Sequence, residues 1–378
     1  MSIRPSTLPA SGLQLRSLIT PEGVLELSLA DIPVQAPGDG EVLVRVQAAP
    51  INPGDLGLLL GPSDLATLKI EGSKTTANVP AALLTGVGGR MGQSLAVGTE
   101  GAGTVIAAGG DDASQALVGR TVAVFGGAMF AEFRVHRAAD VLVLPEGTAA
   151  SEGASSFANP MTALGMIETM RMEGHRALAH TAAASNLGQM LNRICLRDGV
   201  QLVNIVRSGA QASLLREIGA RHIVNTGSPT FAQDLFAALS ATGATIAFDA
   251  VGGGGLASQI LSGMERAQAA SGSYSRYGSS VHKQIYIYGG LATEPTELLR
   301  DYGMAWGVGG WILTGFLAKA GPDRIKSLRQ RVVDELTSTF SSHYTSEISL
   351  RDALRPEVIA AYHRKRTGEK YLINPARP

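Results

Sequence analysis

The clearest pattern in the chain lies between residues 177 and 207, where an apolar run, a small-residue turn, a helical repeat and a second apolar run follow one another. In the repeat, apolar residues recur at helical spacing, which predicts a helix with one apolar face against a sheet. These residues are Leu187, Met190, Leu191, Ile194 and Cys195. The flanking runs predict strands at Ala177–His180 and Gln201–Val206. Together they predict a βαβ unit.

From residue 155 onward, helical and strand-like patterns alternate at intervals typical of crossover connections, which predicts a parallel sheet. The further strands are expected at His222–Asn225, Thr245–Phe248 and Gln284–Tyr288, and the helices at Ala210–Ile218, Phe231–Leu239, Leu256–Glu265 and Ile325–Phe340. Parallel sheets bind ligands at the carboxyl ends of their strands. Asn225, Asp249 and Gly289 are expected at that edge.

The first 155 residues have the short alternating runs and frequent Gly, Pro and Asp of a β-rich domain. Strands are expected at Glu41–Ala48, Thr99–Ala108, Arg120–Phe125, Ala131–His136 and, at the other end of the chain, Lys370–Pro375. Gly61–Ala96 has little periodicity and is expected to be a long connection, and long connections are often functional. The last strand is expected to return to this domain.

Two segments allow two interpretations each. Arg266–Lys283 is rich in Ser, Gly and Tyr and is either a surface loop, the favoured interpretation, or a lid or partner contact. Met304–Leu317 is apolar and spaced by glycines; it is either core or a strand that pairs across the axis of a homodimer, which we favour.

Composition describes a compact protein large enough for two domains: 378 residues, 45% hydrophobic and 17% charged. The formal net charge of +0 and the lack of a basic stripe argue against nucleic acid as a partner. Cys195 is the only cysteine, so neither an intrachain disulfide nor a thiolate zinc cluster can form. No signal-peptide core and no uninterrupted apolar run of ~18 residues is present, so we expect a soluble cytoplasmic protein with no membrane partner.

The turn Ala182–Gly188 has the features of a dinucleotide-binding turn in altered form. Small residues let a phosphate approach the backbone, and the helix N-terminus then binds it. Ala182 and Ser185 stand where the usual fingerprint has its first two glycines. Such a turn can also exist for packing alone.

Several segments in the same order resemble the medium-chain dehydrogenase/reductase superfamily, specifically its zinc-independent quinone oxidoreductase branch. They are Ala49–Leu56, Val97–Val105, Phe130–Phe133, Leu144–Gly147, Asn159–Ala163, His180–Gly188, Gly219–Ala220, Phe248–Gly252 and Gly368–Lys370. The resemblance implies an α/β protein: a GroES-like, β-rich catalytic domain (1–155 and 319–378) with an inserted Rossmann-type, doubly wound parallel-sheet domain (156–318).

The resemblance also decides the zinc question residue by residue. Zinc-dependent relatives have Cys, His and Cys at the places that hold Asn52, Thr99 and Ala158 here. None of these three is a usual zinc ligand, so zinc-dependent alcohol dehydrogenase activity is excluded.

The end of the second strand bears on the choice of cofactor. An NAD site usually has an acidic residue there, whereas this chain has Arg207 followed by Ser208. A guanidinium suits a 2′-phosphate, which favours NADPH. A solvated arginine at a strand end is the alternative. Gln211 and Thr226 stand where relatives have their phosphate-contacting Lys and Tyr.

By resemblance, Asn52 and Thr162 lie close to the nicotinamide, and Asn52 is the residue expected to act in catalysis. The turn is expected to hold the pyrophosphate, and the loops after later strands to contact the nicotinamide mainly through the backbone. The other expected cofactor-binding residues are Ser185, Asn186, Leu187, Gly188, Arg207, Ser208, Val251, Gly252, Gly289, Gly290, Leu291 and Lys370. Asp55 and Glu100 are expected to fix their loops by hydrogen bonds.

These expectations describe an NADPH-dependent reductase that transfers hydride, without a metal, to a small electrophilic acceptor: a quinone or an activated alkene. Enoyl-thioester reductases of the superfamily have a tyrosine in the first domain as proton donor. No tyrosine precedes Tyr274 here, which argues against that subgroup unless Tyr274 or Tyr277 folds into the site. A non-catalytic NADPH-binding sensor or scaffold is a further alternative.

Overall fold

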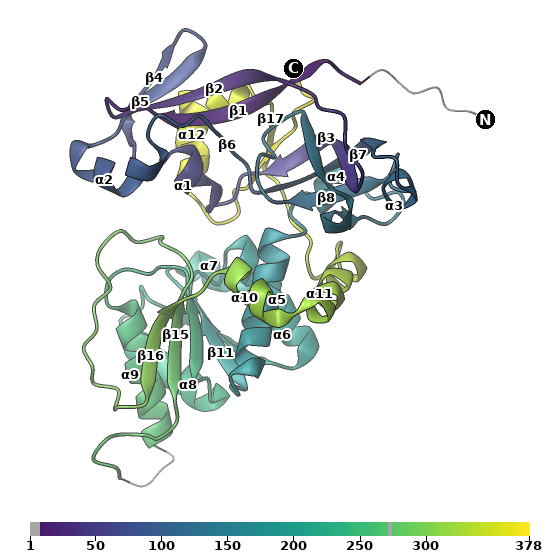
Figure 1. The fold of residues 1–378 in the computed structure, drawn as a ribbon. Helices are drawn as coiled ribbons and strands as arrows, with labels where there is room; N and C mark the ends of the chain where they lie inside the picture. The colour runs from purple at the N-terminus through teal and green to yellow at the C-terminus, as the bar shows by residue number, and fades with distance from the viewer. Residues whose placement is uncertain (1–7, 271–273) are drawn as a thin grey trace. The chain divides into compact units, whose positions relative to one another are not determined.

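The computed structural model describes residues 8–270 and 274–378, which divide into two compact units. Unit 1 comprises the described residues up to Ala158 together with Val332–Pro378, and unit 2 comprises Asn159–Arg331 (Figure 1). The sequence prediction set these boundaries at 155/156 and 318/319.

Unit 1 is built from two sheets, because its strands alternate buried and exposed positions and so cover a shared core. A five-stranded sheet has the order β4-β5-β2-β1-β6, and a seven-stranded sheet has β10-β8-β7-β3-β18-β17, with β9 also paired to β3. The strands are β1 (Ser11–Ile19), β2 (Val24–Pro33), β3 (Glu41–Pro50), β4 (Asp64–Glu71), β5 (Lys74–Asn78), β6 (Leu95–Ala96), β7 (Glu100–Ala108), β8 (Thr121–Phe125), β9 (Phe133–Arg137), β10 (Leu142–Val143), β17 (Ser346–Ile348) and β18 (Tyr371–Ile373).

Short helices close the ends of these sheets. They are α1 (Asp55–Leu59), α2 (Leu84–Val87), α3 (Asp112–Gln115), α4 (Ala150–Gly153) and α12 (Pro356–His363), with 3₁₀ turns at Ala81–Leu83, Gly88–Arg90, Ala138–Asp140 and Asp352–Leu354. The core between the sheets includes fully buried Leu15, Val44, Phe130 and Ile373. Because Leu372 and Ile373 pair antiparallel with Pro50 and Ala49, the end of the chain joins the N-terminal strands.

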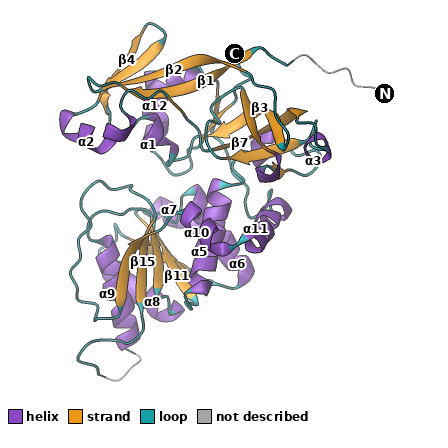
Figure 2. Ribbon diagram, in the orientation of Figure 1, coloured by secondary structure: helices purple, strands orange, loops and turns teal. Residues whose placement is uncertain are grey.

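Unit 2 contains a parallel sheet with helices around it (Figure 2). The sheet is doubly wound, with the order β13-β12-β11-β14-β15-β16. Its strands are β11 (Ala177–His180), β12 (Gln201–Val206), β13 (His222–Asn225), β14 (Ile246–Asp249), β15 (Lys283–Ile287) and β16 (Trp306–Gly310). Its helices are α5 (Ala158–Met172), α6 (Asn186–Asp198), α7 (Gly209–Glu217), α8 (Phe231–Thr242), α9 (Leu256–Ala269), α10 (Leu313–Ala320) and α11 (Pro322–Asp334), the first and last of which cross the unit boundaries.

Both faces of this sheet are covered, which explains why its strands read as apolar runs. Alternate strand residues such as Ala179, Val203 and Ile285 pack with α8 and α9. On the other face, the indole of Trp311 contacts Phe248 of β14, and its Nε1 donates to Thr169 of α5 at 3.0 Å. The predicted order of strands and crossover helices, and with it the fold class, is confirmed.

The structure corrects several predicted elements. Strands β1 and β2 were not predicted, although Leu13, Leu15 and Ile19 recur with a period of two or four. Gly61–Ala96 is not a structureless connection, because it contains the hairpin β4–β5 and short helices. Residues 313–317 form the start of α10 rather than a strand, since only Trp306–Gly310 pairs with β15.

The predicted helix Ile325–Phe340 is also shifted. The structure has α11 at Pro322–Asp334, preceded by α10, and Glu335–Phe340 turns beyond it. In Arg266–Lys283, α9 continues to Ala269, residues 271–273 lie outside the described residues, and the rest is anchored by a buried ion pair. Lys283 Nζ lies 2.5 Å from Glu265 Oε2, and Ser279 N donates to the other carboxylate oxygen.

Candidate functional site

The predicted phosphate turn connects β11 to α6 at the carboxyl edge of the parallel sheet. Ala182 has φ +50°, a left-handed conformation that usually favours glycine. Ala182 thus adopts a backbone conformation that suits the first glycine of the fingerprint, which it replaces. Ser185 caps α6, and its Oγ accepts the Gly188 N–H at 3.1 Å. The first helical turn has no acidic side chain, so the positive end of the helix is not neutralised there.

Gly188 is required by close packing of the helix on the strand. A Cβ at this position would lie 2.2 Å from the Ala183 carbonyl oxygen, well inside any real contact. Gly188 therefore has the role of the third glycine in the dinucleotide fingerprint, which allows the helix to pack closely on the strand. The Gly188 N–H donates to Ser185 Oγ within the protein.

Arg207 follows the end of the neighbouring strand β12, and its side chain is exposed. Its backbone N–H donates to Gln211 Oε1 at 3.0 Å, and Ser208 Oγ accepts the Gln211 N–H at 3.4 Å and caps α7. Gln211 is therefore used in shaping this strand end. Thr226 N donates to the Val206 carbonyl oxygen at 2.8 Å.

The loops after β14 and β15 are fixed by the fully buried carboxylate of Asp249. It accepts the Thr181 hydroxyl at 2.7 Å and the N–H groups of Val251 and Gly252 at 2.9 and 3.1 Å. The Val251 carbonyl oxygen accepts the Ala292 N–H, so both polar backbone groups of Val251 are paired within the protein.

Glycine is needed where these loops approach each other. A Cβ at Gly252, which has φ +79°, would lie 2.6 Å from the Gly289 carbonyl oxygen, and a Cβ at Gly289 would lie 2.6 Å from that of Ala250. Gly290 and Leu291 are exposed beyond this contact. The two loops thus form a compact edge beside the strand ends.

A buried His–Tyr pair lies just behind that edge. His180 Nε2 is 2.7 Å from the Tyr288 hydroxyl, and the rings stack with centroids 5.7 Å apart. Burial lowers the pKa of His180 to about 3 and raises that of Tyr288, so both groups are neutral at pH 7. His180 Nδ1 is buried without a partner among the described residues.

In unit 1, Asn52 belongs to a buried polar cluster. Its Nδ2 donates to Glu100 Oε1 at 2.9 Å, and its backbone N–H donates to Asp55 Oδ2 at 2.8 Å. Asp55 also accepts the backbone N–H and hydroxyl of Thr99, while Glu100 Oε2 accepts the N–H groups at the start of α5. The two carboxylates fix their loops, as predicted. Burial raises the pKa of both.

Lys370 completes this cluster from the start of β18. Its Nζ donates to Ser155 Oγ at 2.6 Å, and Ser155 Oγ is 2.8 Å from the Tyr344 hydroxyl. Burial lowers the pKa of Lys370 to about 8, while the negative charges of Glu100 and Asp55 oppose that shift. Asn52 Oδ1 is buried without a partner among the described residues.

Ser155 and Tyr344 were not identified from the sequence. No tyrosine precedes Tyr274 in the sequence, and Tyr344 enters this unit from its C-terminal part. The predicted return of the chain end to the first domain was the one sequence feature that could have pointed to Tyr344. Tyr274 and Tyr277, the candidates named instead, are 95% and 66% exposed and lie in unit 2.

The predicted site residues fall in both units. Asn52 and Lys370 belong to unit 1, and the others, including half-buried Thr162 near the start of α5, belong to unit 2. Within residues 8–270 and 274–378, no three His, Cys, Asp or Glu side chains are grouped so that they could hold a metal ion. In the same ranges, no helix combines the length and apolar character needed to cross a bilayer.

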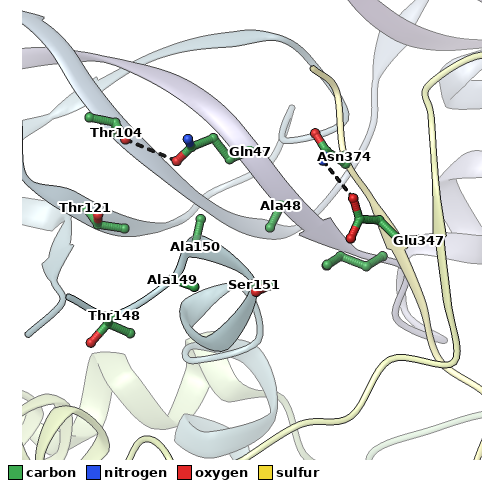
Figure 3. A pocket seen from close by; sticks show the side chains of 11 residues that line it. Gln47, Ala48, Thr104, Thr121, Thr148, Ala149, Ala150, Ser151, Glu347 and Asn374 are labelled. Atoms are coloured by element: carbon green, nitrogen blue, oxygen red, sulfur yellow. Dashed lines mark hydrogen bonds between the residues drawn. The ribbon is translucent and has the colours of Figure 1, made fainter. Parts of the chain in front are cut away.

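A surface pocket of unit 1, with a volume of about 390 Å³, contains none of the predicted site residues (Figure 3). Part of its polar lining is paired internally: Thr104 donates to Gln47 at 3.1 Å and Asn374 donates to Glu347 at 2.8 Å.

Comparison with known proteins gives relatives and structural neighbours that are oxidoreductases. The chain is 28% identical over 233 residues to a mitochondrial enoyl-[acyl-carrier-protein] reductase from Xenopus tropicalis, covering 57% of each protein. It thus spans about half the length of the curated relatives it matches. A search of family models gave no match.

Two solved structures cover nearly the whole chain. A candidate NADPH:quinone reductase from Mesorhizobium loti is 25% identical, with a TM-score of 0.73 over 98% of this chain and 100% of that one. A mycobacterial protein solved in complex with NADPH is 18% identical, with a TM-score of 0.66 over 96% and 100%. The resemblance inferred from the sequence motifs is thereby confirmed.

Proposed function

Since the chain has the two-unit fold of the zinc-independent medium-chain dehydrogenase/reductases, we propose that it is an NADPH-dependent reductase of quinones or activated alkenes. The observation that carries the proposal is the turn between β11 and α6. Its left-handed Ala182, close-packed Gly188 and unneutralised helix end form a site suited to a pyrophosphate. The NADPH complex of the mycobacterial neighbour supports the choice of cofactor class.

The residues present fit this cofactor. The α6 N-terminus would hold the pyrophosphate, and the exposed guanidinium of Arg207 would bind a 2′-phosphate, since no acidic side chain occupies that strand end. Val251, Gly252 and Gly289–Leu291 would pack against the nicotinamide. Bound NADPH supplies a hydride, and the protein has to orient both reactants and exclude water.

In unit 1, we propose that the buried polar cluster of Asn52 and Lys370 contacts the acceptor. Asn52 Oδ1 offers an unpaired, buried acceptor to an N–H or O–H group of the cofactor or substrate. The reaction proposed uses no metal, because Asn52, Thr99 and Ala158 stand where zinc-dependent relatives have ligands.

Enoyl-thioester reduction is the second candidate, favoured by the named activity of the Xenopus relative. The hydrogen-bonded Lys370, Ser155 and Tyr344 also remove the sequence objection that the first domain lacks a tyrosine.

A single assay separates these functions. NADPH absorbance is followed with menadione, an alkenal and crotonyl-CoA in parallel, and NADPH binding is measured by titration. Turnover of menadione or the alkenal supports the first candidate, and preference for crotonyl-CoA supports the second. Tight NADPH binding without turnover of any acceptor would instead identify a sensor or scaffold.

We propose further that the protein is a cytoplasmic homodimer. Strand β16 is the last strand of its sheet, so its outer edge can pair with the same strand of a second copy. Light scattering of the purified protein measures this directly: a mass of one chain, 39.2 kDa, would contradict it.

A further inference from the structure

Three polar side chains of unit 1 form a hydrogen-bonded chain although they come from distant parts of the sequence. Lys370 Nζ donates to Ser155 Oγ at 2.6 Å, and the Ser155 and Tyr344 hydroxyls are 2.8 Å apart. The Lys370 ammonium group also lies 5.5 Å from the centre of the Tyr344 ring, within range of a cation–π interaction. These contacts hold the end of a flexible lysine in one place.

The surroundings of this lysine leave part of its hydrogen-bonding capacity unused. Among the described residues, its only acceptor is Ser155 Oγ, so two of its three N–H bonds remain available. The charged groups that face it are the carboxylates of Glu100 on β7 and Asp55 on α1, and the neutral Tyr344 hydroxyl lies beside it. Asn52 Oδ1, an unpaired buried acceptor, belongs to the same cluster. Unused donors and an unused acceptor in one cluster indicate a ligand.

Building on the proposed function, we propose that Lys370 is the general acid that protonates the α-carbon of a reduced alkene, with Ser155 and Tyr344 as positioning residues. Bound NADPH would supply a hydride to the β-carbon of the acceptor. The alkene π electrons would then form the new double bond between the α-carbon and the carbonyl carbon, and the carbonyl π electrons would move to oxygen, which gives an enolate. The enolate α-carbon then takes a proton from the Lys370 ammonium group. The neutral amine regains a proton from water.

A lysine is suited to this step only if its pKa lies near the working pH. Burial lowers the pKa of Lys370 to about 8, so the group is protonated at pH 7 and can still release its proton. Carbon protonation is what separates an alkene from a quinone, since a reduced quinone takes its protons on oxygen, where water can supply them. The inference therefore narrows the physiological acceptor to an activated alkene.

The test compares one alkene and one quinone with the same variants. Tiglaldehyde, whose α-carbon becomes a stereocentre on reduction, is the alkene, and menadione is the quinone. Lys370→Met should reduce tiglaldehyde at least ~100-fold more slowly and give a racemic product, because general acids contribute about 10²–10⁴-fold. Menadione turnover should fall at least ~10-fold less than tiglaldehyde reduction does, because a reduced quinone needs no proton on carbon.

Two further variants keep the test informative if Lys370→Met folds poorly. Lys370→Arg keeps the positive charge but cannot release a proton near pH 8, so it should show the same selective loss. Lys69→Met, which removes a lysine whose side chain is 61% exposed in the same unit, is the matched control and should behave as the wild type.

A measurement independent of turnover follows Lys370 itself. NMR of ¹⁵N-lysine-labelled protein should show one side chain, absent in Lys370→Met, that titrates near pH 8. Tyr344→Phe and Ser155→Ala should move that titration, and the pH above which tiglaldehyde reduction falls should move with it. Menadione reduction should keep its pH profile in both variants.

The outcomes are distinct. Wild-type-like reduction of tiglaldehyde by Lys370→Met, with unchanged stereochemistry, overturns the inference. So does an equal loss with both acceptors together with weaker NADPH binding, which would make Lys370 a cofactor-binding residue only. Wild-type protein that reduces menadione but not tiglaldehyde overturns the inference and leaves the proposed function standing, whereas failure with both acceptors overturns the proposed function.

Discussion

Replacing Gly188 by alanine tests the turn on which nucleotide binding depends. The new Cβ would lie 2.2 Å from the Ala183 carbonyl oxygen, whereas Cβ atoms in proteins essentially never lie closer than 3.0 Å to such an atom. Since that oxygen is backbone rather than the end of a flexible side chain, the turn and α6 must separate by most of an ångström. Overpacking of this kind costs about 1–3 kcal/mol, and each kcal/mol lowers the Tm of a unit this size by roughly 2–4 °C.

The same displacement moves the α6 N-terminus away from the phosphate position. We therefore expect NADPH to bind about tenfold or more weakly to Gly188→Ala protein that is still folded, a difference of about 1.4 kcal/mol. Fluorescence titration of NADPH measures the dissociation constant, and circular dichroism measures the Tm. Gly310→Ala is the control, because nothing lies within 4 Å of a Cβ there.

Ala182→Gly is the matched opposite change. Its left-handed φ of +50° costs an alanine roughly 1–2 kcal/mol, which glycine does not pay, so this variant should keep NADPH affinity and gain up to about 1 kcal/mol. A Gly188→Ala variant that loses stability yet binds NADPH like the wild type would refute the reasoning and leave packing as the only role of the turn.

Three other predictions follow from single contacts. Arg207→Asp should weaken NADPH binding at least ~10-fold more than NADH binding, because a charge-assisted hydrogen bond contributes about 1.5–3 kcal/mol. Equal losses of affinity for the two cofactors in parallel titrations would refute a role of Arg207 in binding the 2′-phosphate. Lys283→Met should cost unit 2 about 3–5 kcal/mol in urea unfolding, because it leaves Glu265 buried without its partner, and Glu265→Leu added to it should recover part of that loss. The folded pKa of His180, lowered from 6.5 to about 3, means that its contribution to stability is present above pH 6.5 and declines as the pH falls toward 3. The stability advantage of wild type over His180→Gln should therefore shrink across that range, and an advantage independent of pH would contradict burial of a neutral imidazole.

Local pattern was enough to predict the inserted sheet. Strands β11 and β12 have the predicted bounds because they are short runs buried on both faces, and α6 follows its apolar stripe. Strand β13 also has the predicted bounds, although only Val224 in it is buried. The hairpin β4–β5 was missed because no residue of β4 is buried, and because the buried residues of β5, Thr75–Ala77, do not form an apolar run. Residues 304–317 were misread in part because a periodicity-free apolar run does not distinguish a strand from a buried helix.

The site was only partly predictable for a similar reason. Residues adjacent in sequence, such as Ala182 to Gly188, act through local backbone geometry that motifs record. The cluster of Ser155, Tyr344 and Lys370 exists only because the end of the chain pairs with β3, and no local pattern specifies which hydroxyl then meets the lysine. Long-range pairing has to be known before such contacts can be found.

Transfer of deuterium from NADPH labelled at the reactive position of its nicotinamide tests the central claim most directly. With tiglaldehyde as acceptor and a metal chelator present, mass spectrometry should find one deuterium on the β-carbon for each NADPH oxidised. A product without deuterium, or a reaction that stops with chelator and returns with zinc, would contradict metal-free hydride transfer by this protein.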